Sequence, residues 1–142
     1  MGTTIYVTSD HAGFALKTEV VQYLKNKNVI DLGPFNQESV DYPDFSHLMA
    51  LKLSENSEAI GIAICGSGNG IAIGLNRHQH IRAGLVWQPA IAELIKAHNN
   101  ANVIVFPARF MNIKEVVQSL KLYFETPFEG GRHQLRIDKL NF

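Results

Sequence analysis

The sequence has little of three features that mark particular classes of protein: cysteine, net charge and long apolar runs. One cysteine stands among 142 residues, so a disulfide within the chain is impossible, and the free thiol suggests a reducing, cytoplasmic compartment. Lysine and arginine together number 13, as do aspartate and glutamate. A broad nucleic-acid surface needs a basic excess, so no nucleic-acid partner is expected. No window approaches the roughly 20 apolar residues of a membrane span, so no membrane partner is expected.

The composition that is present fits one ordered domain. Hydrophobic residues make up 46% of the chain and charged residues 18%, a balance typical of a globular protein rather than of a disordered one. A chain of 142 residues can bury a substantial core as one unit. We therefore expect a single domain over residues 1–142.

Short apolar runs alternate with longer segments of helical period. Runs typical of strands occupy residues 4–8, 29–33, 59–64, 81–86 and 102–106. Segments with helical periodicity occupy residues 14–27, 45–53, 71–75, 90–97 and 113–124. A polar loop is expected over 34–43 and a short helix near 129–136. This order predicts an α/β fold, a Rossmann-like three-layer αβα sandwich with a five-stranded parallel sheet.

Polar residues cluster around the strand ends. In an open parallel sheet the ligand lies beyond the carboxyl ends of the strands. We expect the site there, built from the polar residues next to the first, third and fifth strands: Asp10, His11, 65–70, His98, Asn99 and Arg109.

The third strand leads into a glycine-rich turn, Cys65-Gly66-Ser67-Gly68-Asn69-Gly70. Glycines permit positive φ and leave backbone N–H groups uncovered, and at a strand-to-helix junction these groups form an anion site. The spacing matches neither a dinucleotide fingerprint nor a phosphate-binding P-loop, so nucleotide binding has little support. A tight turn without a ligand stays open as the alternative.

Cys65 is the more specific feature of this turn. At a helix N-terminus the dipole and the free N–H groups are expected to favour its thiolate. A thiolate there could act as a nucleophile or as a base that removes a proton next to a carbonyl. A lone cysteine that fills space in the core is the alternative.

Other polar residues also have structural explanations. Asp10 could cap a helix, and His98 could close one. Arg132 and Arg136 are four residues apart, so on a helix they would share one face and could hold one phosphate, or simply face solvent. The remaining histidines show no spacing typical of a metal site, so we expect surface or packing positions for His47, His78, His80 and His133.

Seven short motifs occur in order along the chain. They are Ser9-Asp10-His11-Ala12-Gly13-Phe14, Asp41-Tyr42-Pro43, Cys65-Gly66-Ser67-Gly68-Asn69-Gly70, Ile81-Arg82-Ala83, His98-Asn99, Asn102-Val103 and Glu129-Gly130-Gly131-Arg132-His133. Together they resemble the type B ribose-5-phosphate isomerase family, which also includes the subunits of galactose-6-phosphate isomerase.

The resemblance implies interconversion of D-ribose 5-phosphate and D-ribulose 5-phosphate through an enediolate, a step of the non-oxidative pentose phosphate pathway. It implies no metal and no organic cofactor. By this resemblance Cys65 moves the proton between C1 and C2, and His98 opens the furanose ring, with Asp10 nearby. Some members use a glutamate on the following helix as the base; residues 73–75 hold no carboxylate here, so the chain resembles the cysteine-base group.

The resemblance also assigns residues to the substrate. Ser67 and the backbone N–H groups of the turn, Gly66, Gly68, Asn69 and Gly70, would hold the enediolate oxygens. The phosphate set would be His11, Arg109, Arg132 and Arg136, the last two from a C-terminal segment of about 127–142. Tyr42 and Asn99 would line the sugar. Family sites are assembled from two subunits, which implies a homodimer or a dimer of dimers.

Two other functions stay open. A six-carbon substrate such as galactose 6-phosphate or allose 6-phosphate would keep the same mechanism. A non-catalytic module that binds nucleotide or phosphate would leave Cys65, His98 and Asp10 without a shared purpose.

Overall fold

The computed structural model describes residues 2–141 and shows strands alternating with helices. The strands are β1 (Ile5–Ser9), β2 (Val29–Asp31), β3 (Ile60–Cys65), β4 (Ala83–Leu85) and β5 (Val103–Pro107). The helices are α1 (Phe14–Tyr23), α2 (Tyr42–Glu55), α3 (Asn69–Asn76), α4 (Pro89–Ala97), α5 (Ile113–Glu125) and α6 (Arg132–Asp138). Within the described residues, no helix is both long enough and apolar enough to span a bilayer.

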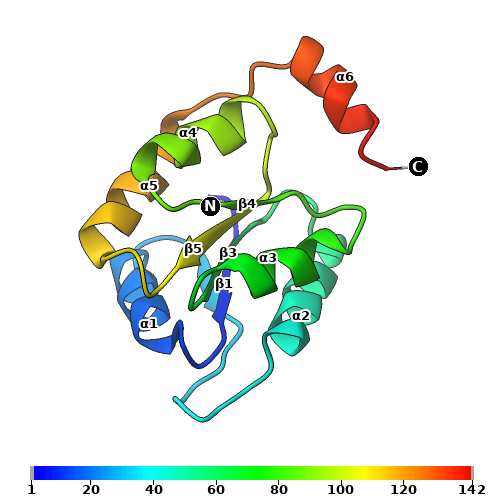
Figure 1. Cartoon of the computed structure of the whole chain (residues 1–142). Helices are drawn as coiled ribbons and strands as arrows, with labels where there is room; N and C mark the ends of the chain where they lie inside the picture. Colours follow the sequence, from blue (N-terminus) through cyan, green and yellow to red (C-terminus); the bar gives the residue numbers. More distant parts are fainter. Residues whose placement is uncertain (1, 142) are drawn as a thin grey trace.

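The five strands form one parallel sheet in the order β2-β1-β3-β5-β4. Helices α1, α4 and α5 cover one face of the sheet, and α2 and α3 cover the other (Figure 1). The predicted α/β sandwich with a five-stranded parallel sheet is therefore confirmed.

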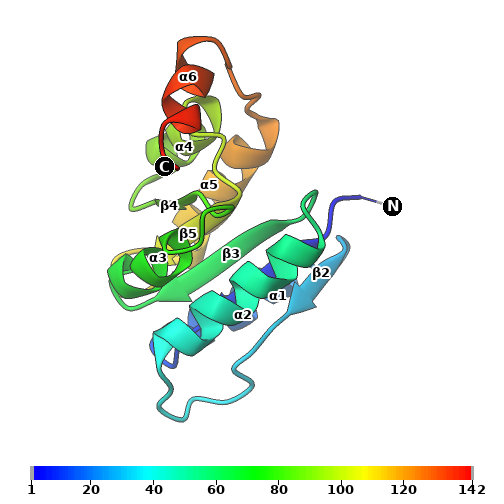
Figure 2. The same cartoon turned by 90° about the vertical axis from the view of Figure 1, so that its right-hand side faces the viewer.

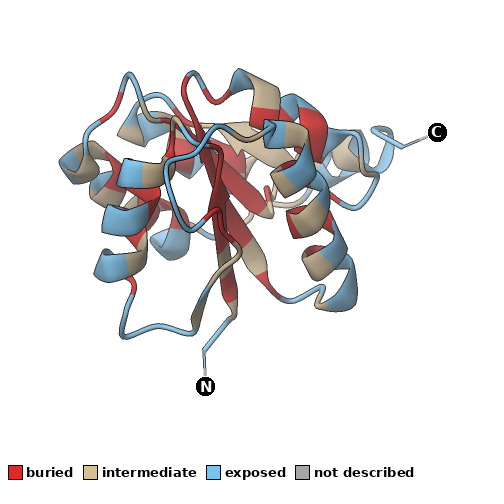
Figure 3. Cartoon of the chain, turned by 90° about the horizontal axis from the view of Figure 1, so that it is seen from below, coloured by how far each residue is buried: buried red, intermediate tan, exposed pale blue. Residues whose placement is uncertain are grey.

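The central strand β3 shows why its sequence is apolar almost throughout. Ile62 and Ile64 pack with α1, α4 and α5, whereas Ala63 and Cys65 pack with α2 and α3. Successive side chains of a strand point to opposite faces, and both faces of this strand are covered, so neither set can be polar. Figure 3 shows the buried strands between helices whose outer sides are exposed.

Several element boundaries differ from the sequence-based expectation. The first helix ends at Tyr23 rather than near residue 27, because the polar residues 25–28 offer no apolar face to pack. The expected loop over 34–43 ends early, since α2 begins at Tyr42 and carries Pro43 in its first turn, a position that proline favours. Helix α3 is longer than expected and β4 is shorter.

Helix α6 stands away from the sheet. It contains no buried residue, and Figures 1 and 2 show it beyond α4, at the opposite end of the molecule from the loops that follow β1 and β2. The short terminal helix expected in the tail is present, and its side chains are largely free to meet solvent or another molecule.

Candidate active site

Cys65 is the last residue of β3, and its side chain is 5% exposed. Burial raises the pKa of the thiol above its ordinary value. The backbone N–H groups of Ile71, Gly68 and Gly70 interact with the sulfur and lower this pKa, while the nearby Asp10 carboxylate raises it. The N–H groups at the helix N-terminus thus favour the thiolate, as expected, but the cost of desolvating the charge is larger and the net pKa is raised.

The turn after Cys65 needs its glycines. Gly68 has φ of +80°, a left-handed conformation, and a Cβ there would collide with Leu85. A Cβ on Gly66 would lie 3.2 Å from Cζ of Arg109, and one on Gly70 would lie 2.7 Å from Cζ of Tyr42. The missing side chains thus let the arginine and the tyrosine approach the turn.

Ser67 and Asn69 of the same turn are exposed. Ser67 Oγ accepts the N–H of Asn69 at 3.3 Å, which shapes the first turn of α3. Sequence reasoning named this pair and the glycines but missed the Ile71 N–H, which is the leading hydrogen-bond influence on the thiol. Its signal was present, because the N–H groups of a helix's first turn have no partner within the helix.

Asp10 and His11 follow β1 beside this turn. The Asp10 backbone N–H donates to Ile64 O at 3.1 Å, and its carboxylate accepts the N–H of Gly13 at 3.0 Å. Asp10 was expected as a possible helix cap. It is not the N-cap residue of α1, but it stabilises the turn before this helix, and its carboxylate also acts on the Cys65 thiol. His11 is exposed, and its Nδ1 lies 3.2 Å from the backbone of Val40.

The predicted site residues separate into two groups at opposite edges of the sheet. Asp10, His11, Tyr42, the turn 65–70 and Arg109 lie at the carboxyl edge. His98 and Asn99 precede β5, so they lie at the amino edge, together with Arg132 and Arg136 of α6. The expectation that His98 and Asn99 join Cys65 at one edge within a chain is wrong, because a residue before a parallel strand and a residue after it are separated by the strand's length. Gly61 pairs with Val103, and Cys65 pairs with Pro107. The distance along the strands from the first pair to the second is about 13 Å.

The amino-edge group contains two residues that sequence reasoning did not assign. The ring of His133 is stacked on that of His98, with centroids 4.3 Å apart and planes 10° apart. Glu129 places Oε1 3.2 Å from His133 Nε2 and Oε2 3.9 Å from His98 Nε2. His133 therefore occupies a packing position, as expected, and the side chain against which it packs is that of His98. The spacing of four residues between Glu129 and His133, across two glycines, was the available signal.

This cluster is the one group in residues 2–141 whose ligand atoms lie close enough to hold a metal, all within 4.8 Å of one another. Its geometry fits a metal poorly. Stacked imidazoles direct their in-plane lone pairs side by side, whereas one ion needs donor atoms that converge on it at about 2.0–2.1 Å. Elsewhere, His47 Nδ1 lies 2.7 Å from His78 Nε2 on the surface.

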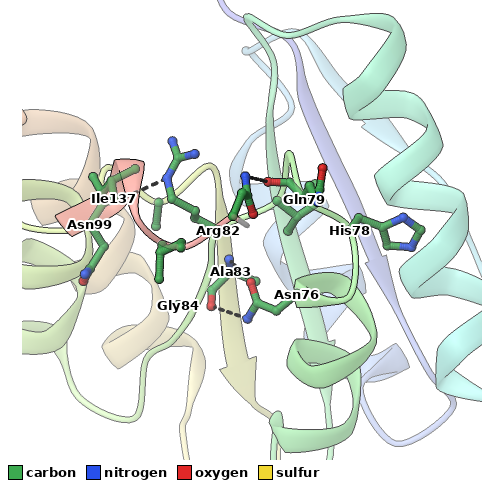
Figure 4. Close-up of a pocket in the computed structure, with 12 residues that line it drawn as sticks. Asn76, His78, Gln79, Arg82, Ala83, Gly84, Asn99 and Ile137 are labelled. Carbon is green, nitrogen blue, oxygen red and sulfur yellow. Dashed lines mark hydrogen bonds between the residues drawn. The ribbon is translucent and has the colours of Figure 1, made fainter. Parts of the chain in front are cut away.

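A cavity of about 370 Å³ lies between the end of α6 and residues 76–84 (Figure 4). Arg82 and Asn99 both line it. The Arg82 guanidinium donates to Asn99 O at 3.0 Å and to Asn100 O at 2.8 Å. These bonds hold a turn in which Asn100 has the left-handed φ of 44°. Arg82 therefore fixes the backbone that carries His98 and Asn99.

Comparison with known proteins decides which family has this arrangement. The model of the Ribose/Galactose Isomerase family matches residues 5–140. The chain belongs to this family. A probable ribose-5-phosphate isomerase B from Mycoplasma genitalium is 41% identical over 99% of this chain and 95% of its own length. The Escherichia coli ribose-5-phosphate isomerase B is 36% identical over 92% of this chain and 89% of its own.

Solved structures agree with the family assignment. A crystal structure of a ribose 5-phosphate isomerase from Thermotoga maritima has a TM-score of 0.94 and 40% identity, covering 98% of this chain and 97% of its own. The Mycoplasma genitalium ribose-5-phosphate isomerase B with bound ribulose-5-phosphate also has a TM-score of 0.94, with 41% identity over 99% of this chain and 95% of its own. The expected family, fold and isomerase class are thus confirmed.

Proposed function

We propose that this member of the ribose/galactose isomerase family interconverts D-ribose 5-phosphate and D-ribulose 5-phosphate. The observation that carries the proposal is the buried thiol of Cys65, which ends the central strand beneath the N–H groups of Gly68, Gly70 and Ile71. The bound ribulose-5-phosphate of the Mycoplasma genitalium relative supports a five-carbon substrate.

The proton transfer uses Cys65 as the base. Its thiolate removes the C2 proton of the open-chain aldose, and the electron pair of that bond moves to give an enediolate with charge on O1. The same thiol returns a proton to C1, while the O2 hydroxyl proton passes to O1, so no proton is gained or lost. The N–H groups of the glycine turn, with the Ser67 hydroxyl, are proposed to stabilise the negative oxygen. Removing one such donor typically costs about 10²–10³ in rate.

Ring opening precedes this step because the aldose is bound as a furanose. His98 donates a proton to the ring oxygen as the C1–O4 bond breaks, and the C1 hydroxyl gives its proton to solvent water to complete the carbonyl. His98 then regains a proton from solvent, so ring opening gains and loses none. Asp10 is proposed to lie near these oxygens, and Tyr42 and Asn99 to line the sugar. His11, Arg109, Arg132 and Arg136 are proposed to bind the phosphate; neither Arg132 nor Arg136 makes an ion pair with another residue of 2–141.

We propose that two chains share each site. Within one chain the amino-edge group and the carboxyl-edge group lie at opposite ends of β5. A two-fold dimer can bring the first group of one chain to the second group of its partner. Helix α6 suits this arrangement, because none of its residues is buried and the exposed apolar side chains Leu135, within it, and Leu140, just after it, are available for contact.

The experiment is a conversion assay with ribose 5-phosphate, run with and without a chelator. We expect turnover that the chelator leaves unchanged, since no metal or cofactor enters the mechanism. Cys65→Ala should abolish turnover yet keep sugar-phosphate binding; full activity in that variant would exclude the thiol as the base.

Mixed dimers test the sharing of the site. Cys65→Ala and His98→Ala chains, each inactive alone, are unfolded together and refolded. Half of the dimers then carry one of each chain, and each mixed dimer has one intact site, so about a quarter of full activity should return. No recovery of activity would contradict the shared site. The reaction itself would still be tested separately by the assay of the wild-type protein.

A six-carbon phosphate is the second candidate, because the family model covers galactose as well as ribose isomerases. Values of kcat/KM for ribose 5-phosphate, allose 6-phosphate and galactose 6-phosphate, measured side by side, decide between them. A preference for either hexose phosphate would overturn the pentose assignment.

A further inference from the structure

Glu129 and His133 surround the side chain of His98 without having a part in the proposed reaction. The His133 ring covers one face of the His98 ring, at 4.3 Å and nearly parallel. The Glu129 carboxylate lies near the Nε2 atoms of both rings, 3.2 Å from that of His133 and 3.9 Å from that of His98. The side chain of His133 is 11% exposed and that of His98 is 39% exposed. The inner ring therefore supports the outer one.

The backbone is arranged to bring these side chains together. The Glu129 N–H donates to Ala97 O at 3.0 Å, which ties the loop after α5 directly to the last residue of α4, next to His98. Gly130 and Gly131 then have left-handed φ values of 68° and 54°. This reversal returns the chain so that His133, in the first turn of α6, faces Glu129 again. A Cβ would meet nothing within 4 Å at either glycine, so the φ values alone require glycine there.

The ring of His133, the less exposed of the two, is held by packing rather than by a hydrogen bond. His133 Nε2 is buried and forms no hydrogen bond with another described residue, because the Glu129 oxygen at 3.2 Å is out of line with it. A buried polar atom left in this way costs free energy. An apolar side chain at position 133 would avoid that cost, so packing stability alone does not explain a histidine there. A functional role would explain it.

We propose that Glu129 and His133 are positioning residues that hold the His98 ring in the orientation required to open the furanose. The inference rests on the proposed function, since it assigns them to its first step. Stacking on His133 restricts rotation of the His98 ring, and the carboxylate at 3.9 Å fixes the side on which Nε2 lies without forming a bond that would occupy it. His98 Nε2 is then free to share a proton with the sugar.

The test separates ring opening from proton transfer. Ribulose 5-phosphate is open-chain, so exchange of its C1 proton with solvent deuterium needs the Cys65 step but not His98. Turnover of ribose 5-phosphate needs both. We expect Glu129→Gln to lower kcat for ribose 5-phosphate by about tenfold, below the about 10²–10⁴ typical of losing an acid–base group itself, while C1 exchange stays near the wild-type rate.

Matched variants make the result specific. His133→Phe keeps a flat ring for stacking and should lose less activity than His133→Ala. Glu125→Gln removes an exposed carboxylate at the end of α5 and should change neither rate. Cys65→Ala should abolish both rates. Thermal unfolding of each variant confirms that it is folded.

Three outcomes would overturn the inference: wild-type turnover in both Glu129→Gln and His133→Ala, equal activity of His133→Phe and His133→Ala, or a parallel fall of exchange and turnover. Failure of the proposed function looks different, because the wild-type protein itself would then convert no ribose 5-phosphate.

Discussion

The ammonium group of Lys17 lies 2.7 Å from both carboxylate oxygens of Asp31, and the two side chains differ sharply in exposure, 1% for the lysine and 27% for the aspartate. The pair joins α1 to the end of β2, and Asp31 Oδ1 also accepts the N–H of Gly33 at 2.8 Å. It therefore anchors the start of the loop that leads to Tyr42.

Removing the two partners should have unequal costs. Asp31→Ala leaves a buried ammonium without a counter-ion, so we expect a loss of about 3–5 kcal/mol in the free energy of unfolding. Lys17→Met replaces the lysine by an apolar chain of similar length and leaves a carboxylate that reaches water, so it should cost clearly less. Urea unfolding at neutral pH measures both. Equal costs would show that Lys17 reaches solvent more readily than its exposure indicates.

Gly13 lies against the backbone of β3, and this contact tests how firmly the edge near Cys65 is packed. A Cβ at Gly13 would be 2.5 Å from Ile64 O and 2.8 Å from the carbonyl carbon, neither of which can move alone. We expect Gly13→Ala to cost about 1–3 kcal/mol and to lower kcat by displacing the neighbouring Cys65. Gly2→Ala, whose Cβ would meet nothing within 4 Å, is the control and should leave unfolding and activity unchanged.

The sequence predicted the fold well because the strands β1, β3 and β5 are apolar runs bounded by polar residues, and that signal is local. It also identified the turn 65–70, since glycine spacing at a strand end has a direct physical meaning. The end of the sheet at which His98 lies was harder to predict. Its motif is local, but the side of the sheet on which it lies follows from its position before β5 rather than after it.

Glu129 and His133 were harder still to interpret from sequence. Their contact with His98 depends on two left-handed glycines and on a bond from the Glu129 N–H to Ala97 O, which brings together segments about 30 residues apart. Such contacts leave no periodic pattern. The protonation of Cys65 was equally out of reach, because burial and the N–H groups act in opposite directions and only the folded chain shows which is larger.

The raised pKa of Cys65 predicts how activity depends on pH. A base must be deprotonated to act, so kcat/KM for ribose 5-phosphate should rise with pH through neutrality and keep rising beyond the ordinary thiol range. Alkylation of Cys65 by iodoacetamide should follow the same profile and be slow at neutral pH, with free cysteine as the reference. A plateau of both rates below the ordinary thiol pKa would contradict the dominance of burial.

Tyr123 predicts a second pH dependence, in stability rather than in rate. Burial raises the pKa of this phenol from its ordinary value of 10.0 to about 12, and its hydroxyl donates to the carbonyl of Ala101, three residues after His98. Between these two values the unfolded chain loses a proton that the folded chain keeps. The phenol's stabilising contribution is therefore complete below pH 10 and declines by about 1.4 kcal/mol per pH unit up to pH 12.

Tyr123→Phe isolates this contribution, because phenylalanine keeps the ring and does not titrate. At neutral pH the variant should be less stable than the wild type by about 0.5–1.5 kcal/mol, the net contribution of one hydrogen bond. As pH rises from 10 to 12 only the wild type loses the phenol contribution, so the difference should shrink and then change sign. Urea unfolding of both proteins at matched pH values measures it. A difference that stays constant up to pH 12 would mean that the phenol titrates alike in the folded and unfolded chains, and would contradict the raised pKa of Tyr123.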